Sequence, residues 1–513
     1  MSDSRLTEKL KVGIVRTKEA LYPKEAPYHP SAQYPEYPFH DFVSNQPNLV
    51  YDGIRRLFSE LELDLPHRNT AEWNPLGHII SKGMTVVIKP NLVMSNVKVP
   101  FAVHNVAISD DDLRHKDIFA IITHPSVLRV IVDYCWIALK GEGRIVIADA
   151  PQYNCDFREL LELTKLDDVV QFVNKFQGPK VEILDLRNYW SKTRHFASLR
   201  RELPGDPKGT VTVNIGKESA FYNVNSSRFY GAVYDRNETI YHHSGERQEY
   251  EISGTILGSD VVIFVPKLKT HKKVGVTCNL KNLVGACTNK NHLVHYTLGP
   301  PSEGGDQYPD GLLTRTERRV INFERWMYDH FLAKRTKRRE LVHRLVYGFI
   351  YMKILKHFGL EVPYEKRMLD AGNWYGNNTA WRMVVDLAKI FYFSDRGGRL
   401  GSKAERRMFS IVDGIIGGEG MGPLSPDPKP VGILLGGDNI LAVDLVATRL
   451  MGFDPHKLKE FVMLDPKYDF GPRRLDDIEI ETDDEVLRNG LRDKTNRLFS
   501  FKPHPGWVGH IEI

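Results

Sequence analysis

The stretch 265–296 carries a dense set of hydrogen-bond donors and few acids. Lys267 and Lys269 lie in its "PKLKTH" segment, and Lys281 and Asn282 lie in its "NLKN" segment. Ammonium groups placed this close repel one another unless something negative lies between them. The combined field of such groups attracts anions, so the stretch is predicted to form one wall of an anion-binding pocket.

His271, in the same stretch, is the candidate for proton transfer. The pKa of an unperturbed imidazole lies near neutrality, and neighbouring ammonium groups tend to keep the ring neutral and able to act as a base. Lys267 and Lys269 would act beside it as catalytic groups by meeting the charge that develops on a substrate. A purely structural histidine is the alternative interpretation.

Further polar groups follow other apolar runs. Lys89 and Asn91 come after "MTVVI", and a turn with Gly437, Asp438 and Asn439 comes after "VGILL". In an open parallel sheet, ligands bind beyond the carboxyl ends of the strands, so these groups are predicted to converge. Asp438 or Asn439 would also cap the next helix near that site, although a tight turn with a cap needs no ligand. The predicted substrate-binding residues are Lys89, Asn91, Lys281, Asn282, Gly437, Asp438 and Asn439.

The carboxylates Asp413 and Glu419 are the acids expected nearest to this cluster, as metal ligands or as an acid/base partner. A second metal hypothesis uses a Cys2His2 set, which comprises Cys278, Cys287, His292 and His295. The first interval of that set is much longer than in zinc hairpins. The alternative is that both cysteines are small apolar fillers, as most free cysteines are.

Apolar, β-branched runs must position these groups, and most of them end in Gly, Pro, Asn or Asp. The runs are "KVGIVR", "MTVVIKPN", "RIVIADAP", "VEILDL", "DVVIFVPK", "FSIVDG" and "VGILLGGDN". Helical patterns lie between several of them, such as "HPSVLRVIVDYCWIALKG", where His124 and Pro125 fit a helix start. This alternation predicts an α/β fold with mainly parallel sheet layers covered by helices.

Two segments interrupt the alternation. Short alternating pieces between residues 217 and 252 predict an inserted β-hairpin region, and a basic helical pattern between residues 315 and 370 predicts an inserted helical segment. Within the second insertion, the basic helix 334–356 is expected to present a solvated face, with contact to anionic lipid as the alternative. The predicted regions are 1–216, 217–252, 253–314, 315–370 and 371–513.

Composition narrows the class of protein. The chain has 513 residues, 42% hydrophobic and 26% charged, with a net charge of +5 that is too diluted to indicate a nucleic-acid partner. The charged start and the absence of any apolar run long enough to cross a bilayer predict a cytoplasmic protein. The sequence has no P-loop, zincin or α/β-hydrolase motif, and its 4 cysteines show no CxxC spacing.

The order of several motifs resembles the DUF362 family. The motifs are "KPNLV", "THPSVLR", "ADAP", "PKLKTH", "GVTCNLKNLVG", "VDGIIGGEGMGP" and "GGDNILAVDLVA". "GGDQYPDG" and "GNWYGNNTAWRMVVDLAKI" look like a longer subgroup, which the resemblance associates with surface-polysaccharide genes. Some members of the family carry a ferredoxin-type module. This chain lacks the cysteines for one, so an integral iron–sulfur cluster is not expected.

The sequence therefore favours an enzyme that acts on a small anionic substrate, either carboxylated or phosphorylated and with a linked sugar as one form. The reaction class stays open between isomerase, lyase and transferase. One alternative is a redox accessory protein that binds a divalent metal or docks an acidic iron–sulfur partner. The other is a non-catalytic module that binds a lipid-linked saccharide at a membrane surface through the basic helix.

Overall fold

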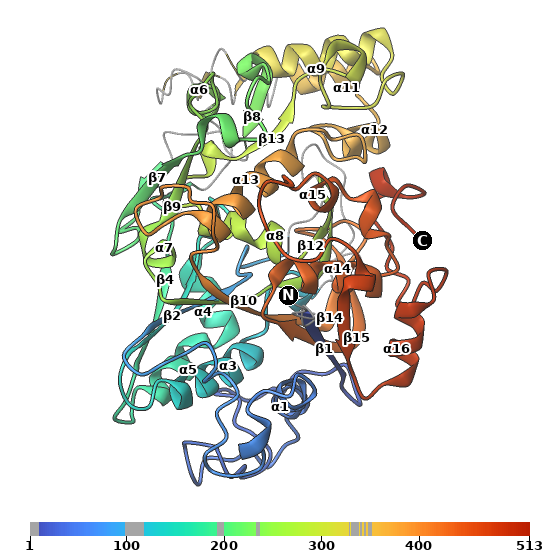
Figure 1. The fold of residues 1–513 in the computed structure, drawn as a ribbon. Helices are drawn as coiled ribbons and strands as arrows, with labels where there is room; N and C mark the ends of the chain where they lie inside the picture. The colour runs from blue at the N-terminus through green and yellow to red at the C-terminus, as the bar shows by residue number, and fades with distance from the viewer. Residues whose placement is uncertain are drawn as a thin grey trace, which may run out of the picture.

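The computed structural model describes residues 10–97, 117–191, 200–231, 236–327 and 351–513, together with positions 329, 338, 341, 342, 345 and 346. A 10-stranded sheet runs through the middle of the molecule, with helices on both sides (Figure 1). In pairing order its strands are β16 (Ile478–Glu481), β1 (Leu10–Arg16), β15 (Asp427–Gly437), β14 (Arg407–Glu419), β10 (Val261–Val265), β2 (Thr85–Pro90), β3 (Arg144–Asp149) and β4 (Lys180–Asp185), with β11 (Lys267–His271) beside β14 and β12 (Gly275–Thr277) beside β11.

The sheet is mixed and mostly parallel. β14, β10, β2, β3 and β4 are successive parallel neighbours, whereas β15 runs antiparallel to both β14 and β1. The five residues of β10 are all buried, as expected of a strand covered on both faces. The predicted α/β class is therefore confirmed.

Several helices cover the two faces of the sheet. The helices of the described residues are α1 (Leu49–Glu60), α3 (Pro125–Ala138), α4 (Phe157–Thr164), α5 (Leu166–Val173), α6 (Arg236–His242), α7 (Gly254–Leu257), α8 (Asn279–Asn282), α9 (Arg315–Met327), α11 (Met352–His357), α12 (Tyr364–Leu369), α13 (Ala380–Phe393), α14 (Ile440–Leu450), α15 (Lys459–Val462) and α16 (Glu485–Arg492). Alternate residues of β10 face opposite cores: Ile263 packs with the core under α1 and α3, and Phe264 packs with the core under α13 and α14.

The segment 217–252 holds short strands and a helix. The small strands of the molecule are β5 (Tyr189–Ser191), β6 (Arg200–Glu202), β7 (Thr210–Asn214), β8 (Phe229–Gly231), β9 (Glu249–Ser253) and β13 (Val294–Thr297). β9 pairs with β7 and β8 pairs with β13, so the strands of this segment pair outside it, and α6 lies between β8 and β9. The boundaries of the five predicted regions stay a prediction.

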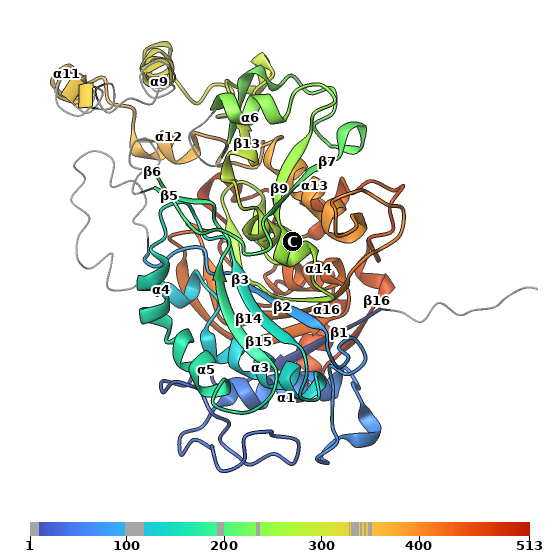
Figure 2. The ribbon, with the colours of Figure 1, turned by 90° about the vertical axis from the view of Figure 1, so that its left-hand side faces the viewer.

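The second insertion forms a separate small core. Val320 and Ile321 of α9 pack with Leu355 of α11, and with Tyr308 and Val362. Figure 2 shows α9 and α11 set away from the large sheet. Most of the predicted basic helix, including Lys334, lies outside the described residues. Within the described residues, the helices are all too short or too polar to cross a membrane.

Two strand ends differ from the prediction. β14 continues past Asp413 to Glu419. Asp413 therefore lies inside a strand and not in a loop after the strand. The "PKLKTH" segment is also a strand, because β11 resumes pairing with β14 directly after Pro266. The backbone carbonyl of Pro266 accepts a hydrogen bond from the Asp413 N–H at 2.9 Å, which keeps the two strands in register across the break.

Candidate functional site

A cavity of about 140 Å³ lies beyond the carboxyl ends of β2, β3 and β10. β11 supplies Lys269 and His271 to its wall, and the loop after β2 supplies Asn91. α8 supplies Lys281 and Asn282. The structure thus brings five of the predicted site residues to one cavity, at the edge of the sheet where a ligand of a parallel sheet is expected.

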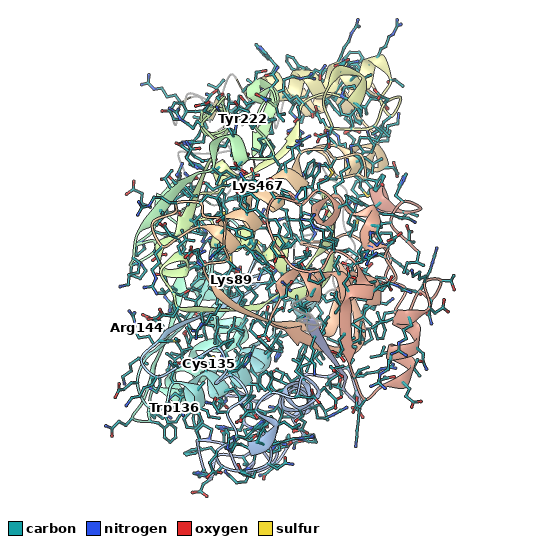
Figure 3. The ribbon with its side chains drawn as sticks, in the orientation of Figure 1. Lys89, Cys135, Trp136, Arg144, Tyr222 and Lys467 are labelled. Atoms are coloured by element: carbon teal, nitrogen blue, oxygen red, sulfur yellow. The ribbon has the colours of Figure 1, made fainter. Side chains whose placement is uncertain are left out.

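The floor of the cavity is an ion pair between neighbouring strands. Lys89 lies in the interior of the molecule (Figure 3), and its Nζ is 2.8 Å from Asp149 Oδ1 on β3. The same ammonium donates to the Asn282 side-chain oxygen at 3.1 Å. Burial lowers the pKa of Lys89, and the Asp149 carboxylate opposes that change. Lys89 is not among the residues that line the cavity. It supports the cavity wall by binding Asp149 and Asn282, which do line the cavity.

Gly285 makes this arrangement possible through its missing side chain. A Cβ at this position would collide with both Asp149 Oδ1 and Lys89 Nζ. Its backbone carbonyl also accepts a 2.6 Å hydrogen bond from the Ala150 N–H, which ties the segment after α8 to the end of β3. The close approach of backbone to an ion pair is a position where only glycine fits.

Lys269 is buried and has no carboxylate partner among the described residues. Its Nζ donates to the carbonyl oxygens of Ile121 at 2.6 Å and Pro423 at 3.2 Å. Burial lowers the pKa of this lysine well below its ordinary value, and the charges of Lys267 and Lys281 lower it further. A neutral amine has two N–H donors and one lone pair. Because two carbonyls take the donors, the lone pair is left to accept a proton.

Lys281 and Lys290 complete the positive side of the cavity. The Lys281 ammonium makes no hydrogen bond or ion pair with any residue that the structure describes. Burial and the charge of Lys290 lower the pKa of Lys281 to about 8, so the group is charged at neutral pH. The Glu460 carboxyl also acts on Lys281, but burial raises the pKa of that carboxyl to about 8.

His271 faces the cavity in a fixed tautomer. Its Nδ1 accepts a hydrogen bond from the backbone N–H of Lys273 at 3.1 Å, so a neutral ring carries its proton on Nε2. Burial lowers the pKa of His271 well below 6.5, and the charge of Lys281 adds to this effect. The neutral ring therefore offers an N–H donor to the cavity. A base at Nε2 would require the other tautomer, which loses the hydrogen bond from Lys273.

Lys267 lies in a different environment. Its Nζ is 3.0 Å from Asp413 Oδ2 and 2.6 Å from the Tyr22 hydroxyl. Asp413 also accepts from the Tyr22 hydroxyl at 2.7 Å and from the His124 N–H at 2.9 Å. The pairing of β11 with β14 shifts register between Lys267, which pairs with Asp413, and Lys269, which pairs with Gly418. Lys267 and Asp413 thus form a buried structural pair outside the cavity.

The turn with Gly437, Asp438 and Asn439 does not join this edge, and the expectation of convergence is wrong for it. Since β15 is antiparallel to β14, Gly437 pairs with Ser410 near the start of β14. Asp438 Oδ1 is 2.9 Å from His78 Nε2, and Asn439 Oδ1 accepts from the Ala442 N–H at 2.9 Å as the cap of α14. The turn is a capped turn at the other edge of the sheet.

The remaining candidate metal ligands lie in different parts of the described structure and do not form one site. Glu419 pairs with Lys429 at 2.8 Å and accepts from the Lys502 N–H at 2.9 Å. Cys278 and Cys287 are buried in the core, as the alternative interpretation of them predicts. Among the described residues, the Cys2His2 set does not assemble, because His295 lines the cavity and His292 groups with Glu238 and His242.

Sequence reasoning missed four residues that take part in these sites. Asp149 lies in "ADAP" at the end of an apolar strand, and this position was a usable signal. Lys290 lies in a 3₁₀ turn with no pattern that indicates burial. Glu238 and His242 are on α6, a helix inside the segment that was predicted to be a β-hairpin. These residues reach their sites only through contacts between distant segments.

Trp381, on α13, belongs to the core. It is 5% exposed and its Nε1 donates to Asn378 Oδ1 at 3.0 Å. Trp374 is half-buried and donates to the Asp306 carbonyl oxygen at 2.9 Å. The indole groups therefore pack and bond within the protein, as is usual for tryptophan.

Three comparisons with known proteins bear on this fold. The family described as Domain of unknown function (DUF362) matches residues 206–449. The thylakoid-associated protein sll1697 of Synechocystis sp. is 41% identical over 54 residues, which cover 10% of this chain and 17% of that protein. The third comparison is with a crystal structure of a Thermotoga maritima protein. It shares 11% identity with this chain at a TM-score of 0.32, over 78% of this chain and 58% of that chain.

The DUF362 match includes the elements that form most of the cavity wall. β11, α8 and the 3₁₀ turn Lys290–His292 all lie within it, as does the cis Gly422–Pro423 loop that carries an acceptor for Lys269. β2 and β3, which supply Asn91 and Asp149, precede it. The resemblance to the DUF362 family drawn from the motifs is confirmed over residues 206–449.

Proposed function

We propose that the protein is an enzyme that binds the phosphate or carboxylate of a small molecule in the cavity and removes a proton from it. The observation that carries this proposal is the pair of cavity lysines without carboxylate partners among the described residues, Lys281 and Lys290, beside the buried amine of Lys269. The Lys89–Asp149 pair is internally neutral, so it does not cancel their charge. A bound anion would supply the missing partner.

The cavity groups divide into two roles. Lys281 and Lys290 hold the anion, while the His271 Nε2–H, with the amides of Asn91 and Asn282, donates hydrogen bonds to oxygen atoms of the substrate. Lys269 accepts the proton through its free lone pair. This assignment moves the base from His271 to Lys269 and leaves Lys267 as structural support. An isomerase or lyase fits such a proton abstraction.

The position of these lysines argues against the docking of an acidic iron–sulfur protein. Lys269 and Lys290 are 1% and 5% exposed, so they can meet a small molecule in the cavity but not a protein surface. The buried site also strengthens each electrostatic contact with a substrate.

Isothermal titration with inorganic phosphate tests the binding step. We expect Lys281→Met to weaken phosphate binding about 10-fold or more, because a charge-assisted hydrogen bond contributes about 1.5–3 kcal/mol. Lys494→Met is the matched control, since that side chain is 83% exposed and lies outside the cavity. Equal phosphate affinity in wild type, Lys281→Met and Lys269→Met would overturn the proposal, as would no phosphate binding at all.

Solvent exchange tests the proton step. Sugar phosphates and short carboxylates are incubated with the enzyme in D2O, and proton NMR follows the incorporation of deuterium. Exchange by the wild type that is lost in Lys269→Met and kept in Lys494→Met supports Lys269 as the base. Exchange that persists in a folded Lys269→Met variant but fails in a His271 variant would restore the histidine to that role.

A second candidate function, contact with an anionic membrane surface that presents a lipid-linked saccharide, rests on α9 and α11. Phe323, Trp326 and Ile354 are 43%, 48% and 46% exposed, and Phe358, directly after α11, is 66% exposed. Basic side chains flank these apolar groups, which suits a headgroup boundary.

Sedimentation with phosphatidylserine vesicles at low salt tests this candidate. The wild type should bind the vesicles, and a double variant, Ile354→Ser with Phe358→Ser, should bind them less. Val486→Ser, at a residue that is 69% exposed on α16, is the control. A wild type that stays in the supernatant ends this candidate.

A further inference from the structure

A cluster of nitrogen and carboxylate groups lies beside the cavity and has no part in the proposed reaction. Ligand atoms of Glu238, His242 and His292 all lie within 4.8 Å of one another. His292 Nε2 is 3.7 Å from Glu238 Oε1 and 3.9 Å from Glu251 Oε1. α6, β9 and the 3₁₀ turn Lys290–His292 bring these residues together from separate parts of the chain.

His292 is the unusual member of this cluster. It is 0% exposed, and neither of its ring nitrogens has a hydrogen-bond partner among the described residues. Buried polar groups are almost always paired, since an unpaired one costs about 1–3 kcal/mol. A neutral imidazole has one lone pair that must be satisfied, and carboxylate oxygens of Glu238 and Glu251 lie within 4 Å of His292 Nε2.

The surrounding groups orient the other ligands. His242 Nδ1 is 2.6 Å from Glu249 Oε2, and because a carboxylate only accepts, Nδ1 carries the proton and the lone pair lies on Nε2. A carboxylate on the far nitrogen is the usual support of a metal-binding histidine. Glu238 is held in the same way, by amide groups of Asn289 at 2.6 Å and Asn291 at 2.7 Å.

We propose that Glu238, His242 and His292 bind a divalent first-row transition ion, with Glu251 as a fourth side-chain ligand. Two imidazoles with carboxylates form a donor set that suits Zn²⁺ and its neighbours, whereas Mg²⁺ and Ca²⁺ prefer oxygen alone. Metal–ligand distances of about 2.0–2.2 Å require neighbouring ligand atoms about 3.3–3.5 Å apart in a tetrahedral site. Binding thus draws the Glu238 and Glu251 carboxylates inward and turns the His242 ring away from its 3.8 Å stack on His292.

The ion has a path to this site. The side chains of Glu238 and Glu251 are each 24% exposed, and that of His242 is 19% exposed, while His292 forms the buried base. This inference stands on the cluster alone and does not depend on the proposed anion chemistry.

Untagged protein, stripped with EDTA and titrated with Zn²⁺, tests the proposal. Elemental analysis after removal of free ions should find one Zn²⁺ per chain, and Co²⁺ substitution should give visible d–d bands of a tetrahedral site. Glu249→Gln should lower Zn²⁺ affinity about 10–100-fold, as loss of an outer-shell partner does, and His292→Gln and Glu238→Gln should lower it further. His456→Gln is the matched control, since that histidine is exposed and far along the chain.

Two results would overturn the site: no retained Zn²⁺ or Co²⁺ in the wild type, or equal affinity in wild type, Glu238→Gln and His292→Gln. Circular dichroism checks that each variant folds. If His292→Gln does not fold, Glu238→Gln and Glu249→Gln decide the question, because both are partly exposed and keep their size. Phosphate titration of the same variants separates this site from the cavity, since they should bind phosphate as the wild type does.

Discussion

Lys267 and Lys269 lie two positions apart on β11, yet their surroundings are opposite. Lys267 has a carboxylate at 3.0 Å, whereas Lys269 has only carbonyl oxygens at 2.6 Å and 3.2 Å. Both are buried, and burial lowers the pKa of both. A buried lysine with its own carboxylate stabilises the fold. One without such a partner, beside other lysines and a cavity, is poised to bind an anion or accept a proton.

Removing one member of the structural pair is the strongest way to test this contrast. Lys267→Met should lower the free energy of unfolding by about 3–5 kcal/mol, because it leaves the Asp413 carboxylate buried without its cation. Denaturant titration measures the loss. The double variant with Asp413→Leu should recover part of it, and additive losses would show that the two residues do not interact.

The glycine at the cavity floor offers the next test. Gly285→Ala should cost about 1–3 kcal/mol of unfolding free energy, because the added Cβ collides with the Lys89–Asp149 pair. Gly397→Ala is the control, since its Cβ would lie no closer than 3.3 Å to a neighbour. Phosphate affinity should also fall, because the added Cβ displaces Asp149 from the cavity wall. A variant as stable as the wild type would mean that the pair is more loosely held than the contacts indicate.

The pH dependence of anion binding sharpens the role of Lys281. Burial and Lys290 lower its pKa from 10.5 to about 8, while Cys287 and Glu460 oppose this change. The ammonium is charged below that value, so sulfate affinity should fall as pH rises through it, by about 10-fold or about 1.4 kcal/mol. Sulfate serves as the probe because its charge stays constant. The decline should be smaller in Lys281→Met, and an identical profile would exclude Lys281 as the titrating group.

The contribution of Lys281 to the free energy of unfolding changes with pH in the opposite direction to its contribution to anion affinity. Between about 8 and 10.5 the unfolded chain binds this proton more tightly than the folded chain does. Stability from this group therefore rises with pH over that window. Denaturant titrations of wild type and Lys281→Met at both ends of the window measure the difference.

The capped turn provides a smaller effect at the other edge of the sheet. Asn439→Ala should cost about 1 kcal/mol of unfolding free energy through loss of the α14 cap. Phosphate affinity should stay unchanged, because the turn lies away from the cavity. A clear loss of affinity in this variant would contradict the placement of the cavity as the anion site.

The stability of Lys281→Met should not fall at all. This lysine makes no hydrogen bond or ion pair among the described residues and burial disfavours its charged form, so its removal should leave the free energy of unfolding unchanged or increase it. Side-by-side denaturation with Lys267→Met gives the contrast directly. Similar losses in both variants would remove the distinction between the two kinds of lysine.

Local patterns in the sequence determined much of the fold. Apolar runs predicted β2, β3, β10 and the start of β14, and the caps His124 and Asn439 marked the starts of α3 and α14. The density of lysines in β11 and α8 indicated an anion site, since charges of one sign in one segment need a compensating partner. The family resemblance also followed from motif order alone.

Only the tertiary structure decided which lysine has a carboxylate partner. Lys267 meets Asp413 from β14, whereas Lys281 meets no acid partner among the described residues, and nothing near either lysine in the chain distinguishes them. The antiparallel course of β15 moved the Asn439 turn to the other edge, because strand direction depends on pairing and not on local composition. His242 and His292 likewise meet only through packing of distant segments. Charge neutralisation and ligand sets are properties of contacts between segments, which a local pattern does not contain.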